Sequence, residues 1–457
     1  MLKKRSMNLF HRLSPVQILL TYYLLAIIIS AIILSMPFIY KEDVVIDFVD
    51  ILFTAVSALS VTGLTTISIG DSFNTMGLIV LAGILHLGAV GLMTVSTLIW
   101  LMIGKKIGLS ERRLIMADQN QSSFGGMVKM VKEIIYVVLV IECIGIVLLG
   151  THFLSYFPSV GDAYLHGFFS TISAISNAGF SIENNSMMNF SHDYFVQSIM
   201  MFLIIFGAIG FPVLIEVKAF LLRYRKRNGE RLRPYRFSLF TKLTTTTFFL
   251  LIIVGTLFIY LIDINHFFSG KGVVEGFFYA LFQSVTTRSS GLSTMDISMF
   301  TESNQLFLSL LMFIGASPSS AGGGIRTTTF ALVIIFIITY ARGGKKIKVF
   351  NREIYDEDLL KAVTVMIIAI ALVFISLLIM SIIEPFSMTE ILFESTSAFG
   401  TVGLSLGITS EISVLSKFIL MILMFIGRIG VVTFLLSFRN ERQTESVRYP
   451  RERMIIG

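Results

Sequence analysis

The segment Ser57-Ala-Leu-Ser-Val-Thr-Gly63-Leu-Thr occurs in similar form four times along the 457-residue chain. The other copies are Ser173-Ala-Ile-Ser-Asn-Ala-Gly179-Phe-Ser, Val285-Thr-Thr-Arg-Ser-Ser-Gly291-Leu-Ser and Ser397-Ala-Phe-Gly-Thr-Val-Gly403-Leu-Ser. In each copy a glycine is followed by Leu or Phe and then by Ser or Thr, and the glycines are almost evenly spaced. The repeat predicts four related units whose small, polar loops meet around one ion.

The composition places the chain among membrane proteins. Hydrophobic residues make up 54% of it and charged residues 14%, whereas soluble domains carry about 25% charged residues. The mean hydropathy is +0.82. The single cysteine, Cys143, lies in an apolar run and excludes a disulfide framework. The first apolar run, 15–38, is long enough to span a bilayer, so we expect a membrane helix there and not a cleaved signal peptide.

Basic residues gather between the apolar segments, about one cluster to each unit. The run 223–236 holds seven basic residues and one Glu, and other clusters lie at 3–5, 105–113, 342–352 and 439–453. The positive-inside rule then predicts that both termini and the three linkers between units are cytoplasmic. Nucleic-acid binding is the alternative explanation for this charge, and the dispersal of the clusters at the ends of apolar runs disfavours it.

Eight apolar runs are candidate membrane spans, at 15–38, 75–103, 128–157, 194–222, 237–264, 305–340, 359–383 and 414–438. A shorter apolar stretch precedes each repeat glycine, at 48–59, 165–175, 274–285 and 388–399. These stretches are too short to cross a bilayer and are typical of re-entrant half-helices.

We therefore expect an all-α polytopic membrane protein with eight transmembrane helices and four re-entrant pore helices. Four units of span, half-helix, loop and span, at 15–113, 114–236, 237–352 and 353–440, would surround one pore with pseudo-fourfold symmetry. A cytoplasmic segment, 1–14, and a cytoplasmic tail, 441–457, would flank them. Half-helices that point their carbonyl ends at the axis favour a cation there.

The residues around each glycine predict a filter for a monovalent cation. Backbone carbonyls turned toward one axis supply oxygen ligands, and glycine reaches the required backbone angles without a Cβ clash. No carboxylate recurs in the four loops, which argues against a divalent-selective ring. The predicted filter residues are Val61, Thr62, Gly63, Asn177, Ala178, Gly179, Ser289, Ser290, Gly291, Thr401, Val402 and Gly403.

Arg288, three residues before Gly291, has no counterpart in the other loops. It either ties the filter turn to a carboxylate, with Glu394 as the candidate, or sets the electrostatic field at the filter. An unpaired cation facing the lumen would repel the permeant ion, so we expect the tie.

The paired glycines of the second spans, in Gly88-Ala-Val-Gly91, Gly207-Ala-Ile-Gly210 and Gly427-Arg-Ile-Gly430, also have two interpretations. They serve close helix packing, or they make the inner helices bendable.

The run 305–340 is too long for one straight crossing and is interrupted by proline and three consecutive glycines. We expect two half-helices joined by a loop on the cytoplasmic side of the filter. The loop is either a gate or a simple packing kink, and its residues are Gly315, Ala316, Ser317, Pro318, Ser319, Ser320, Ala321, Gly322, Gly323 and Gly324, followed by Arg326.

Three further polar residues lie within the spans. Arg428 is costly inside a membrane and is expected to face the cavity, an acidic group or the carbonyls of that loop, as a latch or as a structural pair. His86 and Glu142 are given no role.

Four features carry a resemblance to a known family: the four glycine loops, the stretch 315–326, Arg428 within Met424-Phe-Ile-Gly-Arg-Ile-Gly, and the ending Tyr449-Pro-Arg-Glu-Arg-Met-Ile-Ile-Gly457. In these features the chain resembles the Trk/Ktr/HKT superfamily of potassium transporters, and the Ktr membrane subunit in particular. The resemblance implies potassium (K⁺) uptake across the bacterial plasma membrane, often enhanced by sodium (Na⁺). It also implies a homodimer of separate pores on a cytosolic ring of nucleotide-binding subunits that respond to ATP and ADP. Gly63, where sodium transporters of the superfamily carry Ser, favours potassium. No organic cofactor is expected on this chain.

Two other functions agree less well with the sequence. A secondary active cation symporter of a different architecture would share the glycine-rich breaks, although it would use inverted repeats, whereas these repeats keep one orientation. An enzyme is disfavoured because no His, Cys or carboxylate cluster with catalytic spacing occurs.

Overall fold

A computed structural model describes residues 14–91, 127–225, 235–344 and 346–437, with residues 94, 95, 97, 108, 112, 114–116 and 452 between and beyond them. Within this part of the chain the fold is helical apart from one short hairpin, β1 (Lys348–Val349) with β2 (Arg352–Glu353). The expected cytoplasmic ends, 1–14 and 441–457, lie outside the described residues except for Ser14 and Glu452.

Each unit begins with a long apolar helix. These are α2 (Pro15–Leu34), α8 (Met127–Phe153), α12 (Leu239–Ile262) and α16 (Asp356–Ile383). All four are long and apolar enough to cross a membrane. Ser14 caps α2 in a capping box with Gln17, and Ser238 caps α12 through the Thr241 amide, so the starts of these helices are fixed by local sequence.

The four expected half-helices are present as separate helices. They are α3 (Phe48–Ser60), α9 (Val160–Ser176), α13 (Val273–Thr286) and α17 (Met388–Gly400). The longest has 17 residues, about 26 Å at 1.5 Å per residue, which is short of the ~30 Å hydrocarbon thickness. Each ends just before its repeat glycine.

The second apolar runs of the first, second and fourth units are interrupted at their glycine pairs. In the first, second and fourth units the helix stops at the second glycine of the pair, because Gly91, Gly210 and Gly430 have φ of +93°, +99° and +93°. A positive φ ends a right-handed helix. The helices are α5 (Thr75–Val90), the pair α10 (Tyr194–Ala208) and α11 (Phe211–Arg225), and the pair α18 (Val414–Ile429) and α19 (Val431–Ser437).

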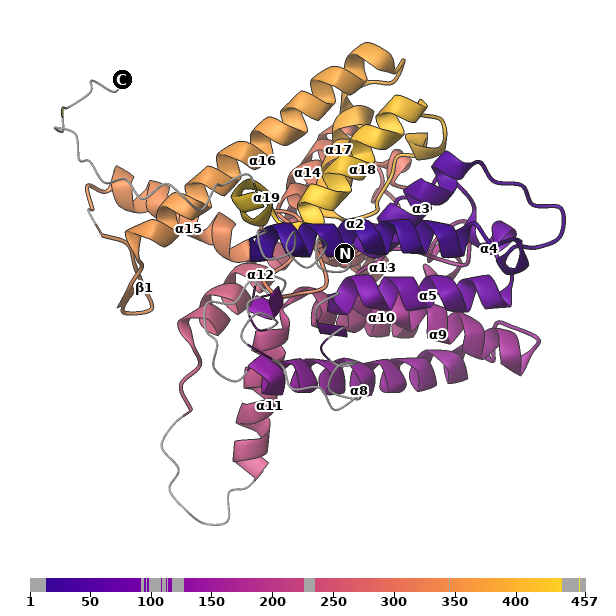
Figure 1. Cartoon of the computed structure of the whole chain (residues 1–457), viewed down its shortest axis with the longest axis horizontal. Helices are drawn as coiled ribbons and strands as arrows, with labels where there is room; N and C mark the ends of the chain where they lie inside the picture. Colours follow the sequence, from indigo (N-terminus) through magenta and orange to yellow (C-terminus); the bar gives the residue numbers. More distant parts are fainter. Residues whose placement is uncertain are drawn as a thin grey trace, which may run out of the picture.

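The bend between α10 and α11 is 106°, and Figure 1 shows α11 running across the direction of α8. By length and composition the described residues therefore hold four single spanning helices, or five with this bent pair, where eight were expected.

The predicted break in the third unit is confirmed. Helix α14 (Glu302–Phe313) is followed by irregular backbone and then by α15 (Thr327–Ala341). We call residues 314–326 the unit-three loop. All of them except Arg326 are buried.

The units contact one another in a closed cycle. The second helix of each unit packs on the half-helix of the next: α5 on α9, α10 on α13, α14 on α17, and α18 back on α3. The last contact joins the two ends of the chain, and Figure 1 shows α18 beside α3. The cycle brings the C-terminal ends of the four half-helices together.

Candidate functional site

The four repeat glycines form a ring. A Cβ built on Gly63 would lie 2.9 Å from the Gly179 Cα, and one on Gly179 would lie 3.3 Å from the Gly291 Cα. The same construction on Gly291 reaches the Gly403 Cα at 2.9 Å, and on Gly403 it reaches the Gly63 Cα at 2.9 Å, which closes the ring. We call these four residues the glycine ring.

Carbonyl oxygens lie against every member of the ring. Added Cβ atoms would meet the backbone oxygens of Ala178, Ser290, Val402 and Thr62, at 2.4, 2.5, 2.1 and 2.2 Å. The glycines also have φ between +70° and +94°, which other residues rarely adopt. Both constraints select glycine at these positions.

The residues two before each glycine share a second backbone feature. Val61, Asn177, Ser289 and Thr401 have φ of +59°, +55°, +100° and +49°. Such angles cost of order 1–3 kcal/mol for a residue with a Cβ and persist only where the surroundings enforce them. The residue between this position and the glycine does not share the positive φ in any unit. The turn after the half-helix is nearly the same in the first, second and fourth units, where the residue two before the glycine is the left-handed C-cap of the helix. In the third unit the helix ends earlier, with Thr287 as a right-handed C-cap, and only the positive φ two residues before the glycine is shared.

Buried hydroxyl groups brace these turns. The Ser57 Oγ accepts a hydrogen bond from the Gly63 amide at 3.1 Å, and the Ser397 Oγ accepts one from the Gly403 amide at 3.0 Å. In the other units the Ser173 Oγ donates to the Phe180 carbonyl and the Thr286 Oγ1 donates to the Leu292 carbonyl, both at 2.6 Å. These residues were missed from sequence, although the Ser at the start of three repeat segments was the available signal.

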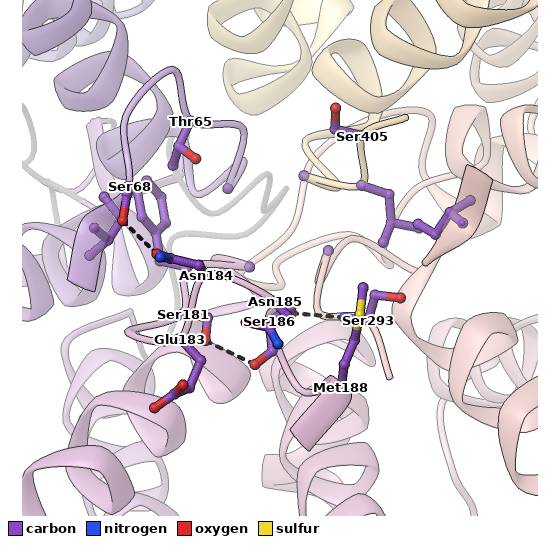
Figure 2. A pocket seen from close by; sticks show the side chains of 18 of the residues that line it. Thr65, Ser68, Ser181, Glu183, Asn184, Asn185, Ser186, Met188, Ser293 and Ser405 are labelled. Carbon is purple, nitrogen blue, oxygen red and sulfur yellow. Dashed lines mark hydrogen bonds between the residues drawn. The ribbon is translucent and has the colours of Figure 1, made fainter. Parts of the chain in front are cut away.

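A cavity of about 400 Å³ opens on one side of the ring. The ring glycines form its floor, and its walls carry hydroxyl, amide and carboxylate groups, including Glu183 and Asp296. Figure 2 shows Thr65, Ser181, Ser293 and Ser405, one from each unit, around it. We call it the glycine-ring cavity.

Hydrogen bonds between units hold the walls of this cavity. Asn184 accepts from Ser68 at 2.5 Å (Figure 2). It also donates to the Asp71 Oδ2 at 2.7 Å. Bonds from Asn184 and Ser68 hold the pKa of Asp71 below its usual range. The Ser293 amide donates to the Ser186 Oγ at 3.0 Å. The first three units are thus tied together above the ring.

The unit-three loop lies on the opposite side of the ring and docks on the broken helices of two other units. The Ser317 and Ala321 amides donate to the carbonyls of Ala208 and Gly207, both at 3.0 Å. The Gly324 amide donates to the Gly427 carbonyl at 3.1 Å. The breaks in the second and fourth units therefore free the carbonyls that hold this loop.

Arg428 joins the same loop to the first unit. Its guanidinium donates to the Ala321 carbonyl on one side and to the Gly88 carbonyl on the other, with the Ala89 carbonyl 3.1 Å from Nη2. Of the partners expected for Arg428, the structure places it on the loop carbonyls. Arg326 donates to the Gly322 carbonyl and so braces the loop internally.

Comparison with known proteins identifies the family. The model of the TrkH family, described as cation transport proteins, matches residues 12–449. The chain belongs to the TrkH family. Since this is a family of cation transporters, the expectation that the chain is not an enzyme is confirmed.

Relatives of this TrkH-family chain match over nearly its whole length. It is 52% identical to the Ktr system potassium uptake protein D of Bacillus subtilis (strain 168), over 98% of this chain and 99% of that protein. It is 35% identical to the Ktr system potassium uptake protein B of the same organism, over 98% and 97%. The potassium transporter TrkH of Vibrio parahaemolyticus has the same fold, with a TM-score of 0.72, 18% identity, and 92% and 83% of the two chains covered.

The expected tie between Arg288 and Glu394 is wrong for this TrkH-family chain. Arg288 is completely buried, its Nη2 donates to the Leu311 carbonyl at 2.5 Å, and no carboxylate of the described residues lies within 4 Å of it. Glu394 instead accepts from Ser405, Leu406 and Thr409 at 2.5, 3.2 and 3.0 Å. Residues 405–409, which follow Gly403, thus supply the hydrogen-bond donors to this carboxylate in place of the arginine.

Two side-chain pairs, one an ion pair and one a histidine–carboxylate hydrogen bond, join helices of different units of this TrkH-family fold. Lys417 on α18 lies 2.6 Å from Asp50 on α3, where the fourth unit closes on the first. His86 on α5 lies 2.9 Å from Glu142 on α8. Neither pair could be predicted from the sequence, because the partners are far apart in the chain.

Proposed function

We propose that the chain is the ion-translocating subunit of a Ktr-type potassium uptake system in the bacterial plasma membrane. The observation that carries the proposal is the closed glycine ring, in a chain 52% identical to a protein named for potassium uptake in such a system. In this proposal each unit crosses the membrane twice and returns a pore helix between the crossings. Both termini are then cytoplasmic.

The glycine ring and its flanking residues form the selectivity filter in this proposal. Potassium enters the glycine-ring cavity and loses water to the carbonyl oxygens of residues 61–63, 177–179, 289–291 and 401–403. Support comes from the four backbone oxygens that pack one against each ring glycine. Carbonyl oxygens carry no net charge, so the ion binds and still leaves. Arg288 is buried behind the third filter segment, and its hydrogen bond to the Leu311 carbonyl supports the turn before Gly291.

The residues Gly315 to Gly324 of the unit-three loop form the gate in the same proposal. Support comes from the position of the loop across the ring from the cavity, from its bonds to the second and fourth units, and from Arg428, which links it to the first. The loop has no helix or strand of its own, and apart from the apolar contacts of Ala316 and Ala321 it is held by backbone carbonyls and one arginine. In this proposal it therefore moves without unfolding the helices. Arg428 is the latch, and Arg326 keeps the loop in shape.

The remaining partners follow from the names of the relatives. Proteins B and D are each parts of a Ktr system, which supports a second, cytosolic subunit. We propose a homodimer of this chain on a ring of subunits that bind ATP and ADP. Sodium as activator or co-ion is supported by the potassium/sodium uptake protein NtpJ of Enterococcus hirae, which is 29% identical.

The test is growth at limiting potassium of a bacterial strain without uptake systems of its own. The native chain is expected to restore growth, and Gly63→Ser and Gly291→Ser are expected to abolish that rescue. Gly270→Ser is the matched control, because Gly270 also has a positive φ (+80°) but has open space where its Cβ would stand. All variants are compared at equal abundance in the membrane. Full rescue by both filter variants would refute the filter assignment, and no rescue by the native chain would refute potassium uptake.

A further inference from the structure

A single hydroxyl joins the unit-three loop to two of the four filter segments. The Ser289 Oγ donates to the Thr401 carbonyl at 2.8 Å and accepts from the Gly323 amide at 3.3 Å. A serine hydroxyl has one proton and two lone pairs, so it makes both bonds at once. Ser289 and Thr401 are the residues two before ring members Gly291 and Gly403.

The loop also fits this place without spare room. A Cβ on Gly322 would lie 2.3 Å from the Ser289 Oγ, and a Cβ on Gly323 would lie 2.5 Å from the Thr401 Oγ1. Ser289 and Thr401 are completely buried. The loop cannot approach or withdraw at this point without changing what surrounds the Thr401 carbonyl.

The equivalent residues of the first two units make no such link. Val61 has no polar side-chain atom. The Asn177 amide faces the backbone of α10, at Ile204 and Ala208. Contact between loop and filter is thus concentrated in the third and fourth units.

We propose that Ser289 couples the position of the unit-three loop to the conformation of the third and fourth filter segments. We call the loop seated when the Gly323 amide donates to Ser289, as it does in this structure. Potassium bound in the ring would hold the Thr401 peptide in the orientation that accepts from Ser289, and this would favour the seated loop. By thermodynamic reciprocity, a seated loop would favour potassium in the ring. The inference rests on the proposed function, because it takes the ring as the potassium site and the loop as the moving part. Ser289 is then a positioning residue for both.

The test measures exposure of the loop with a single reporter cysteine. Cys143→Ser removes the native thiol, and Ser320→Cys places the reporter in the loop, where the native side chain is 8% exposed. The purified protein in lipid nanodiscs is treated with a water-soluble methanethiosulfonate, in potassium or in choline. We expect potassium to slow modification by about fivefold or more, the lower end of typical coupling between sites.

Adding Ser289→Ala removes the hydroxyl and keeps the Cβ, and we expect it to reduce the potassium effect to less than about twofold, since the coupling free energy is lost. Ser309→Ala is the matched control, because Ser309 is also buried, and among the described residues its hydroxyl bonds only to the Gln305 carbonyl of its own helix. This control is expected to keep the full effect. If Ser289→Ala does not fold, Ser289→Gly removes the same hydroxyl at a φ that glycine tolerates.

A full potassium effect in folded Ser289→Ala would overturn the coupling. So would a modification rate of the reporter protein that is the same in potassium and choline. Potassium uptake by the native chain is measured separately, so a failure of the proposed function is distinguishable from a failure of the coupling.

Discussion

Gly403 packs on Gly63, so that the fourth repeat closes on the first. A Cβ on Gly403 would lie 2.2 Å from the Thr62 carbonyl oxygen and 2.9 Å from the Gly63 Cα. The two glycines belong to opposite ends of the chain. Their contact therefore depends on the packing of all four units, and it makes the ring sensitive to one added methyl group.

Gly403→Ala is expected to lower potassium uptake at least tenfold, because its Cβ would displace a carbonyl of the neighbouring unit by about 1 Å or more, beyond the few tenths that packed atoms yield. The matched control is Gly407→Ala. Gly407 has a φ of +99°, close to the +94° of Gly403, but nothing lies within 4 Å of the place that an added Cβ would take. The control carries a backbone cost of ~1–2 kcal/mol and no clash. Rates of uptake are measured at equal membrane abundance, and similar rates for the two variants would contradict the close-packed ring.

The pair Lys417–Asp50 is expected to stabilise the closure of the fourth unit on the first. Its nitrogen and oxygen are 2.6 Å apart, and the side chains are only 11% and 18% exposed. Lys417→Met leaves a largely buried carboxylate unpaired. We expect it to lower the free energy of unfolding by about 1–3 kcal/mol, and with it the midpoint of thermal unfolding.

Adding Asp50→Asn is expected to recover part of that loss. The measurement is a double-mutant cycle on purified protein, and strictly additive effects would show that the pair contributes nothing.

Asp193 gives the chain a pH-dependent contribution to stability. It is the N-cap of α10 and accepts from the amides of Phe195 and Val196 through Oδ1. Through Oδ2 it accepts from His152 and Tyr156. Burial alone would raise the pKa of this carboxyl, but these hydrogen bonds outweigh it and hold the pKa below its usual value of 3.8. A lowered pKa in the folded state means stability that is present above pH 3.8 and lost as the pH falls through the folded value.

Asp193→Asn keeps the helix cap and removes the charge. We expect it to unfold at lower temperature than the native chain at pH 7, with the difference shrinking as the pH falls below about 4. Thermal unfolding of both proteins across this pH range is the measurement. A difference that stays constant with pH would assign the effect to packing and not to charge.

The features of this site that could be predicted from the sequence are those that depend on residues close together in the chain. Each ring glycine has a positive φ and lies against a neighbouring carbonyl, and glycine is the residue that satisfies both conditions. The repeated glycine at 63, 179, 291 and 403 therefore predicts these positions. Proline and the glycine run likewise predicted the unit-three loop. In both cases the residues that cause the backbone feature are the residues that show it, so the sequence alone predicts it.

The partners of long polar side chains could not be predicted in this way. Arg288 was expected on Glu394 by charge alone, but it reaches the Leu311 carbonyl, because the carboxylate is taken by Ser405 and Thr409. The glycine pairs were interpreted as packing or bending, and they do both: Gly88 packs on the Leu59 carbonyl, and Gly91 ends the helix. Only the packing of the units decides among such alternatives.

Arg428→Gln is expected to raise potassium flux through the proposed gate. The native guanidinium holds the Ala321 carbonyl of the loop and the Gly88 carbonyl of the first unit. A hydrogen bond with a charged donor contributes ~1.5–3 kcal/mol, so its loss should increase the population of the unseated loop by about tenfold or more. Arg428→Lys keeps the charge but lacks the fork that reaches two carbonyls, and we expect an intermediate flux. Both variants are reconstituted in liposomes, where flux is measured with a potassium-sensitive dye and thermal stability is measured in parallel. A native flux in a variant of lowered stability would show that Arg428 only supports the fold, whereas raised flux at near-native stability would assign it to the latch.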